Sequence, residues 1–280
     1  MSAGAGSFRR EERLQKLLAE SKWHVEELRR QLENPETSAA LSSRQRAARQ
    51  RAARKKQQRL QQAIAQLPEL KQKRRRRQAM EGVDNRSGNK EPRVSSSDAE
   101  ARVMKMPNGG FNPACNVQLA TDTESRAIVG VEVSHEGSDS AGLSQPMREQ
   151  VEQRSGGKVE QHLLDGGYLR MADLEQAQQQ GVELFVPPKP ARQTHRRGRE
   201  LEPKPGDSAA VLAWKRRMGS AEGQQIYRQR AATSETVNAD LRSHRGLTQL
   251  TVRGLAKAKC VALWCALAYN VMHFGPALLQ

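Results

Sequence analysis

Apolar residues recur three or four positions apart in the first part of the chain, a spacing typical of helices that bury one face. Within residues 9–33 the apolar stripe consists of Leu14, Leu17, Leu18, Val25, Leu28 and Leu32. Residues 43–79 are rich in Ala, Gln and Arg and have few apolar positions. We predict a long amphipathic helix over 9–33, ended near Asn34 and Pro35. Residues 43–79 are predicted to form a solvated helix or helical hairpin that needs a partner to be fully ordered.

From residue 114 onward the pattern changes to short apolar or alternating runs separated by helical stretches. Predicted strands cover residues 114–122, 127–135, 159–164 and 182–186, and a hairpin turn at 121–125 joins the first two. Predicted helices cover residues 143–154, 171–180, 208–218, 221–241 and 253–272. The pattern divides the chain into a basic helical region at 1–80, a linker at 81–113 and an α/β domain at 114–275. A polar loop near 138–140 and a basic, proline-rich loop at 189–207 connect elements of the domain.

The composition limits what the chain can build and suggests its partner. Of its 280 residues 36% are apolar and 4% aromatic, so we expect one core of modest size. The net charge of +16 predicts a polyanionic partner, and nucleic acid is the usual one. Residues 1–79 hold 21 Lys and Arg against 8 Glu. The basic block at 43–79 is interpreted either as a contact surface for the phosphate backbone or as a solubilising arm.

The cysteines and the apolar C-terminal stretch bear on the cellular compartment. Cys115, Cys260 and Cys265 lack metal-binding spacing and are expected to be reduced and structural. The first residues do not resemble a signal peptide. Residues 260–272 are strongly apolar but shorter than the roughly 20 residues that cross a bilayer. We therefore expect a buried C-terminal helix, no membrane association and a cytoplasmic location.

Two acidic residues stand where a metal site could form. Asp165 follows the apolar run at 159–164 and precedes Gly166 and Gly167, so it ends a predicted strand, and Glu235 lies on a predicted helix. A carboxylate at the edge of a sheet offers a hard oxygen ligand to a divalent cation. Without further context, Asp165 also fits a simple turn residue, and Glu235 also fits a solvated acid on a helix.

Several motifs, taken in their order and spacing, resemble the DDE transposases of bacterial insertion elements. These motifs are Asp98–Lys105, Gly109–Pro113, Asn116–Gln118, Leu164–Tyr168, Tyr227–Glu235 and Val252–Asn270. In the helical motif a tyrosine and an arginine precede the glutamate. Arg242 follows Glu235 about two helical turns later, on the same face. The resemblance covers residues 8–275.

The resemblance implies a ribonuclease-H-like mixed sheet with a long basic helical insertion near the N-terminus. It also implies an activity, the cleavage and transfer of DNA strands in transposition. Members of this family hold Mg²⁺ with three carboxylates. Asp165 would be the second carboxylate and Glu235 the third, while Tyr227, Arg230 and Arg242 would contact DNA phosphates. The implied partners are the transposon ends and the target DNA, and a homodimer is one option for assembly.

The chain departs from the family at the first carboxylate. Residues 1–7 contain neither an acid nor residues of high β propensity, so the central first strand and its Asp are expected to be missing. Asp122 is a poor substitute because it lies in a predicted turn. The last motif also differs at three polar positions where the family has apolar residues or proline: Ser234, Thr236 and Asn238.

Two hypotheses follow from these observations. The first is a DDE transposase that is inactive unless the missing strand and Asp are supplied. The second is a non-catalytic DNA-binding remnant that acts through the basic helices. An RNA-binding protein is less favoured because no aromatic platform is visible. His135 and His162 are interpreted as structural residues rather than metal ligands.

Overall fold

A computed structural model describes residues 3–34, 41–81, 91–106, 108–137, 144–189 and 198–278. The chain divides into two compact units. Unit 1 comprises Met1–Cys115 and Thr251–Lys257, and unit 2 comprises Asn116–Leu250 and Ala258–Gln280. The predicted loop at 138–140, residues 190–197 of the basic loop at 189–207, and residues 82–90 and 107 of the predicted linker lie outside the described residues.

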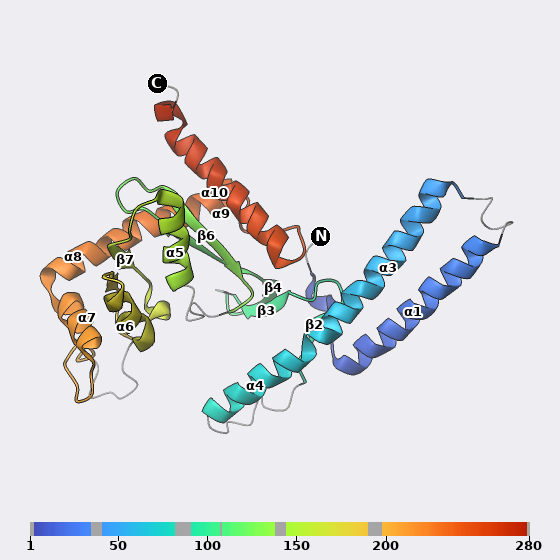
Figure 1. Cartoon of the computed structure of the whole chain (residues 1–280), viewed down its shortest axis with the longest axis horizontal. Helices are drawn as coiled ribbons and strands as arrows, with labels where there is room; N and C mark the ends of the chain where they lie inside the picture. Colours follow the sequence, from blue (N-terminus) through green and yellow to red (C-terminus); the bar gives the residue numbers. More distant parts are fainter. Residues whose placement is uncertain are drawn as a thin grey trace. The chain divides into compact units, whose positions relative to one another are not determined.

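Unit 1 is built on a pair of helices that lie side by side, α1 (Glu11–Glu33) and α3 (Ser43–Ala65) (Figure 1). Helix α4 (Leu67–Glu81) follows α3 directly, and Lys71 on α4 forms an ion pair with Glu11 on α1. The buried cluster of this unit consists of Leu14, Leu60, Ala63, Leu67, Val94 and Ala99. Both predicted helical regions are confirmed, and the partner of the basic helix α3 is the amphipathic helix α1.

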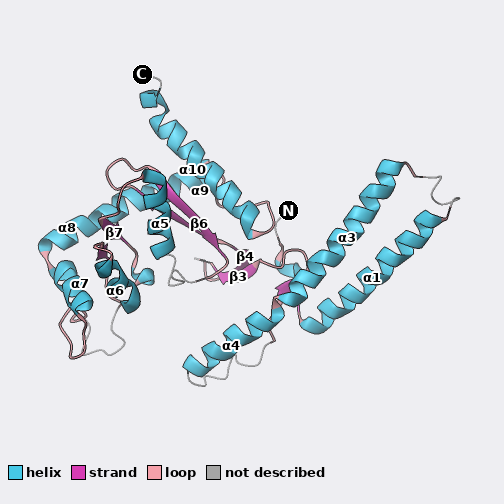
Figure 2. Ribbon diagram, viewed as in Figure 1, coloured by secondary structure: helices cyan, strands magenta, loops and turns pink. Residues whose placement is uncertain are grey.

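Two short antiparallel sheets complete unit 1 (Figure 2). Strand β1 (Phe8–Arg9), which follows the 3-10 turn η1 (Ala5–Ser7), pairs with β2 (Val94–Ser95). Strand β3 (Arg102–Lys105) pairs with β4 (Phe111–Ala114). The β3–β4 hairpin was not predicted.

Unit 2 contains two further pairs of strands, in the predicted order. Strand β5 (Asn116–Thr121) pairs antiparallel with β6 (Ile128–Ser134), and β7 (Gln161–Leu163) pairs parallel with β8 (Glu183–Phe185). All four predicted strands and the hairpin turn are therefore confirmed, and the mixture of helices and small sheets is compatible with the α/β class. Within the part of the chain that the structure describes, the two pairs are separate sheets rather than one mixed sheet.

The β7–β8 pair forms the larger core together with η2 (Gly166–Tyr168), α6 (Met171–Gln179), α7 (Ala209–Gly219) and α8 (Ala221–Arg230). Helix α5 (Ser144–Ser155) packs on β6, and α9 (Thr236–His244) packs against the π-helical segment that precedes it. Buried residues of β8, α6 and α7 pack together, among them Phe185, Leu174 and Trp214. The Trp214 indole donates a hydrogen bond to the Val186 carbonyl at 2.9 Å, which anchors the end of β8 to α7.

The C-terminal helix α10 (Leu255–Leu278) is only partly buried, which corrects the expectation of a buried helix. Its buried positions are mostly small and lie on one face: Ala258, Ala262, Cys265, Ala266 and Tyr269. Its exposed large side chains are Trp264, Leu267, Val271 and Met272. Residues 255–276 of this helix have the length and mean hydropathy of a membrane span. One such helix is weak evidence for membrane insertion, because core helices of soluble proteins share these properties. Asn270 exchanges two hydrogen bonds with the backbone of Ile128, so α10 packs on β6.

The three cysteines are free thiols, as predicted. Cys260 is exposed, Cys115 is half-buried and Cys265 is buried. The Cys265 thiol donates a hydrogen bond to the Arg245 carbonyl at 3.2 Å.

Candidate functional site

Asp165 lies two residues beyond the end of β7, as its position after the apolar run predicted. The backbone N–H of Leu164 still donates to the Phe185 carbonyl at 2.8 Å, so the pairing with β8 ends directly before Asp165. The Asp165 carboxylate accepts a hydrogen bond from Gly166 N–H at 2.8 Å, which begins the turn η2. Its side chain is 61% exposed. The carboxylate is therefore held at a strand end and faces solvent.

Glu235 ends a π-helical segment, η4 (Ala231–Glu235), which interrupts the single helix predicted over 221–241. Thr233 Oγ1 donates to the carbonyls of Gln229 and Arg230 at 3.0 and 3.2 Å. Thr236 Oγ1 and Asn238 Nδ2 also donate to carbonyls four residues earlier. Such side-chain bonds to the backbone satisfy carbonyls where a wider turn loosens the helical ladder. The polar residues at 236 and 238 thus belong to the local structure of the helix.

Arg230 brings the two predicted carboxylates together. Its Nη2 atom lies 3.9 Å from Asp165 Oδ1 and 4.0 Å from Glu235 Oε1. The guanidinium also lies 5.8 Å from the centre of the Tyr227 ring, one turn earlier on α8. Burial raises the pKa of the Tyr227 hydroxyl, and the charge of Arg230 offsets part of that rise. Four of the five residues singled out from the sequence are therefore neighbours.

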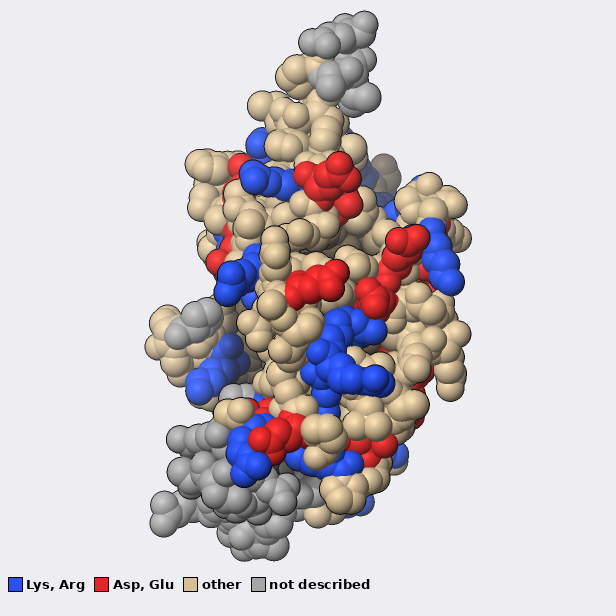
Figure 3. Space-filling view, turned by 90° about the vertical axis from the view of Figure 1, so that its left-hand side faces the viewer, with Lys and Arg blue, Asp and Glu red and all other residues tan. Residues whose placement is uncertain are grey.

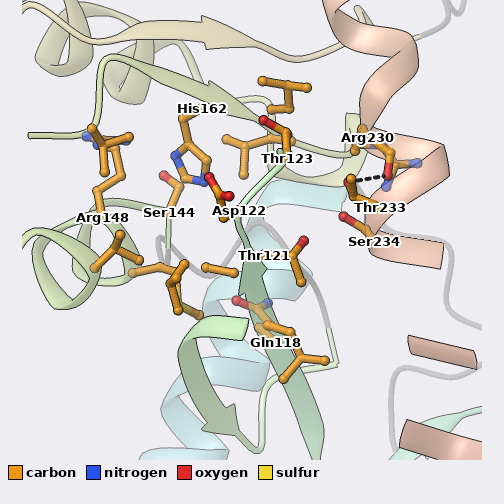
Figure 4. A pocket seen from close by; sticks show the side chains of 18 of the residues that line it. Gln118, Thr121, Asp122, Thr123, Ser144, Arg148, His162, Arg230, Thr233 and Ser234 are labelled. Atoms are coloured by element: carbon orange, nitrogen blue, oxygen red, sulfur yellow. Dashed lines mark hydrogen bonds between the residues drawn. The ribbon is translucent and has the colours of Figure 1, made fainter. Parts of the chain in front are cut away.

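A cleft of about 880 Å³ adjoins these residues. Asp165, Arg230 and Arg242 line it, while Tyr227 and Glu235 do not and are linked to it through Arg230. Figure 4 shows His162, Arg148 and Ser144 in one part of the cleft and Arg230, Thr233 and Ser234 in another.

Sequence reasoning missed one buried basic side chain of the cleft, Arg148. Arg148 on α5 is 3% exposed and donates to Gln180 Oε1 at 3.0 Å, and burial lowers the pKa of its guanidinium. Burial, assisted by the charge of Arg148, lowers the pKa of His162 from 6.5 to about 3. A buried histidine held neutral agrees with the structural role predicted for it. The burial of Arg148 depends on how α5 packs, which its local sequence does not reveal.

In the part of the chain that the structure describes, no third acid joins Asp165 and Glu235. Among the described residues no group of three or more His, Cys, Asp or Glu side chains could hold a metal ion. Asp122 lines the cleft but accepts hydrogen bonds from Ser125 N–H and Oγ at 2.8 and 2.6 Å. These bonds lower the pKa of Asp122. It is a turn acid, as predicted.

Basic side chains are distributed differently over the two units. In unit 2 acidic and basic residues are interspersed on the face seen in Figure 3, and ion pairs join Arg217 to Glu183 and Lys215 to Asp207. Helix α3 in unit 1 carries eight Lys and Arg and no acid. A surplus of basic residues of this kind is the usual footprint of a phosphate-binding surface.

Comparison with known proteins gave one match. A family model described as a transposase DDE domain matches residues 85–271, about two thirds of the chain, and its range includes Asp165, Glu235 and all four strands of unit 2. The chain matched none of the curated proteins and none of the solved structures with which it was compared.

Proposed function

Because the chain belongs to the family of the transposase DDE domain, we propose that it acts in DNA transposition through a metal site formed by Asp165 and Glu235. The observation that carries this proposal is the convergence of both carboxylates on one Arg230 nitrogen, at 3.9 and 4.0 Å. Two exposed acids from distant parts of the chain repel each other unless a positive charge lies between them. Here that charge is a guanidinium, and in the functional complex it would be a metal ion.

The donor set fits a hard divalent cation. Mg²⁺ is commonly bound through one or two carboxylates, with water and substrate phosphate as the remaining ligands. Asp165 and Glu235 would hold the ion, which when bound neutralises phosphate charge and activates a nucleophile for strand cleavage. Arg230 and a cation would compete for the same carboxylate oxygens. Cation binding would therefore release the guanidinium toward a DNA phosphate.

Phosphate contacts are assigned to the residues around this site. Arg230 and Arg242 line the cleft beside Asp165, and Tyr227 lies against Arg230. Guanidinium groups bind phosphate with paired hydrogen bonds, and these residues would orient the DNA strand relative to Asp165 and Glu235. The partners proposed are the transposon ends and the target DNA, bound in the cytoplasm.

The proposed arrangement of the domain is ribonuclease-H-like. The antiparallel pair β5–β6 followed by the parallel pair β7–β8, with helices between, is compatible with this topology. The first strand of that topology would carry the third carboxylate. Since the described residues supply two acids at the site, we propose that the chain alone binds DNA and does not cut it.

A plasmid-nicking assay with Mg²⁺ tests this function. The purified chain should bind supercoiled plasmid and nick it no faster than Asp165→Asn and Glu235→Gln variants do. Metal binding is the second readout, because Mn²⁺ paramagnetic relaxation should broaden signals near Asp165 in the native chain and not in a variant that combines Asp165→Asn with Glu235→Gln. Metal-dependent nicking that Asp165→Asn abolishes would refute the inactive state, and absence of both nicking and metal binding would refute the metal site.

A second candidate function is DNA binding by a non-catalytic remnant that uses the basic helices in place of the metal site, and the acid-free basic helix α3 favours it. Binding measured by fluorescence anisotropy should weaken with salt, with a slope of about −0.9 per neutralised phosphate. The variant Arg51→Gln/Arg54→Gln/Lys55→Gln changes three exposed residues of α3 and should reduce that slope by up to about 3.

The matched control for this test changes three exposed basic residues of unit 2, Arg170→Gln/Lys204→Gln/Arg216→Gln. It should leave the salt slope nearly unchanged. Equal losses in both triple variants would show that net charge, and not helix α3, determines binding.

A further inference from the structure

An apolar stripe, formed by Cys260, Trp264, Leu267 and Val271, runs along the exposed face of α10. These residues are separated by four, three and four positions. All of them are exposed, Trp264 to 66% and both Leu267 and Val271 to 51%. Apolar positions that repeat every 3.5 residues form the seam along which two helices pack side by side. A contiguous exposed apolar patch is also a common mark of an interaction surface.

The opposite face of α10 already has contacts. Ala262 and Ala266 are buried there. Lys259 Nζ forms an ion pair with Glu132 at 2.9 Å, and Asn270 exchanges hydrogen bonds with the backbone of β6. These contacts hold the helix to unit 2, so the stripe cannot turn inward unless they break. Within the described residues, the stripe is therefore the face of α10 that can take a further partner.

The stripe is complementary to a second copy of itself. A twofold axis between Trp264 and Leu267 would pair two copies of the helix in antiparallel orientation. Each Trp264 would then face Leu267 of the second copy, and each Cys260 would face Val271 of the second copy. Every layer of the seam would contain one larger and one smaller apolar side chain and no charge. A twofold dimer requires a surface of this self-complementary kind.

The charges of α10 favour the same occupant and the same direction. The helix contains no Asp or Glu, and its only Lys or Arg residues are Lys257 and Lys259 near its start. In an antiparallel pair Lys257 lies beside the last turns of the other helix, where free carbonyl groups carry partial negative charge. In a parallel pair the two Lys257 side chains would meet and repel. Unlike helices usually select each other through charged residues beside the seam, and the stripe has none after Lys259.

The size of the stripe sets the expected strength of association. Specific dimers bury about 1,200–2,000 Å² in total, and weak, transient pairs bury less. The large exposed side chains of the helix are Trp264, Leu267, Val271 and Met272. Even a fully buried aromatic side chain contributes at most about 250 Å², so two copies reach the lower end of that range. The expected pair is reversible, with a dissociation constant of about 10–100 μM.

We infer that two copies of the chain associate through the apolar stripe of α10, antiparallel, with Trp264 of each copy packed on Leu267 of the other. A lipid surface is the competing occupant, because residues 255–276 have the mean hydropathy of a membrane span. The bonds that hold the buried face to unit 2 oppose insertion of the whole helix. A single exposed lysine, Lys257, gives the stripe little attraction for anionic lipid. The inference rests on no step of the DNA chemistry proposed above.

Sedimentation equilibrium of the full chain, without DNA or metal, tests the association. From about 1 to 500 μM the average mass should rise from that of one chain toward that of two. Trp264→Glu should weaken association at least about tenfold, because a central aromatic residue carries much of the binding energy. The matched control is Trp23→Glu on α1, since Trp23 is 68% exposed and the change in charge is the same. The control should associate like the native chain, and both variants should melt close to it.

Disulfide trapping tests the orientation. Antiparallel pairing places Val271 opposite Cys260 of the second copy, and it separates the two Cys260 residues by about 16 Å along the helix axis. A disulfide requires Cα atoms within about 7 Å of each other. With an added thiol oxidant, Val271→Cys should therefore give covalent dimers linked between positions 260 and 271, which mass spectrometry of the linked peptides identifies. The native chain should not form a link between two Cys260 residues.

Four results would overturn the inference. The first is the mass of a single chain at every concentration, and the second is equal weakening by Trp23→Glu and Trp264→Glu. The third is a Cys260–Cys260 link in the native chain, which indicates a parallel pair. The fourth is binding to vesicles of phosphatidylcholine and phosphatidylglycerol that Trp264→Glu abolishes, by a chain that does not associate with itself.

Discussion

Replacing Gly223 by Ala tests how tightly the turn between α7 and α8 is packed. A Cβ at this position would lie 2.0 Å from the carbonyl oxygen of Arg217 and 3.1 Å from Ser220 Oγ. That carbonyl accepts hydrogen bonds from Ser220 Oγ at 2.8 Å and from Ser220 N–H at 3.2 Å. Ser220 Oγ in turn caps α8 by accepting from Gly223 N–H at 3.0 Å. The new methyl group therefore has to displace backbone and not the end of a flexible side chain.

The expected cost follows from these contacts. Loss of the cap costs about 1 kcal/mol, and overpacking against a fixed backbone costs about 1–3 kcal/mol. The greater helix propensity of Ala returns about 0.5–1 kcal/mol. The net loss is about 1–3.5 kcal/mol, which lowers the melting temperature by about 2–14 °C for a domain of this size.

Gly219→Ala is the matched control, because Gly219 ends α7 and a Cβ there meets no atom within 4 Å. It should leave stability unchanged or raise it by up to about 1 kcal/mol. Thermal unfolding followed by circular dichroism compares the two variants with the native chain. Equal melting temperatures for Gly219→Ala and Gly223→Ala would refute the argument from close packing.

Three further predictions concern single side chains of unit 2. Burial lowers the pKa of His162 from 6.5 to about 3. Between these pH values the unfolded chain binds a proton that the folded chain does not. Acidification through this pH range therefore lowers the free energy of unfolding, by at most about 1.4 kcal/mol per pH unit. Urea unfolding near neutral pH and at about pH 4 should show a smaller pH dependence for His162→Asn than for the native chain, and identical pH dependences would contradict the assignment. Trp214→Phe removes the donor to the buried Val186 carbonyl and should cost about 1–3 kcal/mol by chemical denaturation, so a change within error would argue against that hydrogen bond. Asn270→Asp replaces the donor to the Ile128 carbonyl with a carboxylate and should cost about 1–3 kcal/mol of stability at neutral pH. Below about pH 4 the protonated carboxyl can donate again, so part of the lost stability should return. A loss that does not change with pH would indicate a packing effect and not this hydrogen bond.

The elements around the site could be predicted because local pattern and tertiary environment agree. The alternating and apolar runs at 127–135 and 159–164 contain strands β6 and β7, and Asp165 lies at the strand end that the following glycines indicate. The β3–β4 hairpin escaped prediction for a physical reason. Val103 and Phe111 are 46% and 66% exposed, so burial does not give these short strands a clear alternating pattern.

The geometry that joins the site residues could not be predicted from local pattern. The proximity of Asp165 and Glu235 follows from the packing of α8 and η4 beside β7, and Arg230 reaches both acids only in that arrangement. The π segment has no signal in hydrophobic spacing, because one extra residue in a polar stretch leaves the pattern unchanged.

The π segment η4 sets the rotation of helix α9 about its axis relative to helix α8. A π turn holds about one residue more than an α turn, and each residue of an α-helix advances the side-chain direction by about 100°. Residues after η4 are therefore rotated about the helix axis relative to a continuous α-helix. Deleting one residue between Ala231 and Glu235 would turn Arg242 away from the cleft while leaving Tyr227 in position. Insertions and deletions in this segment would therefore rotate Arg242 relative to Tyr227. They would change the geometry of the site without changing any of its side chains.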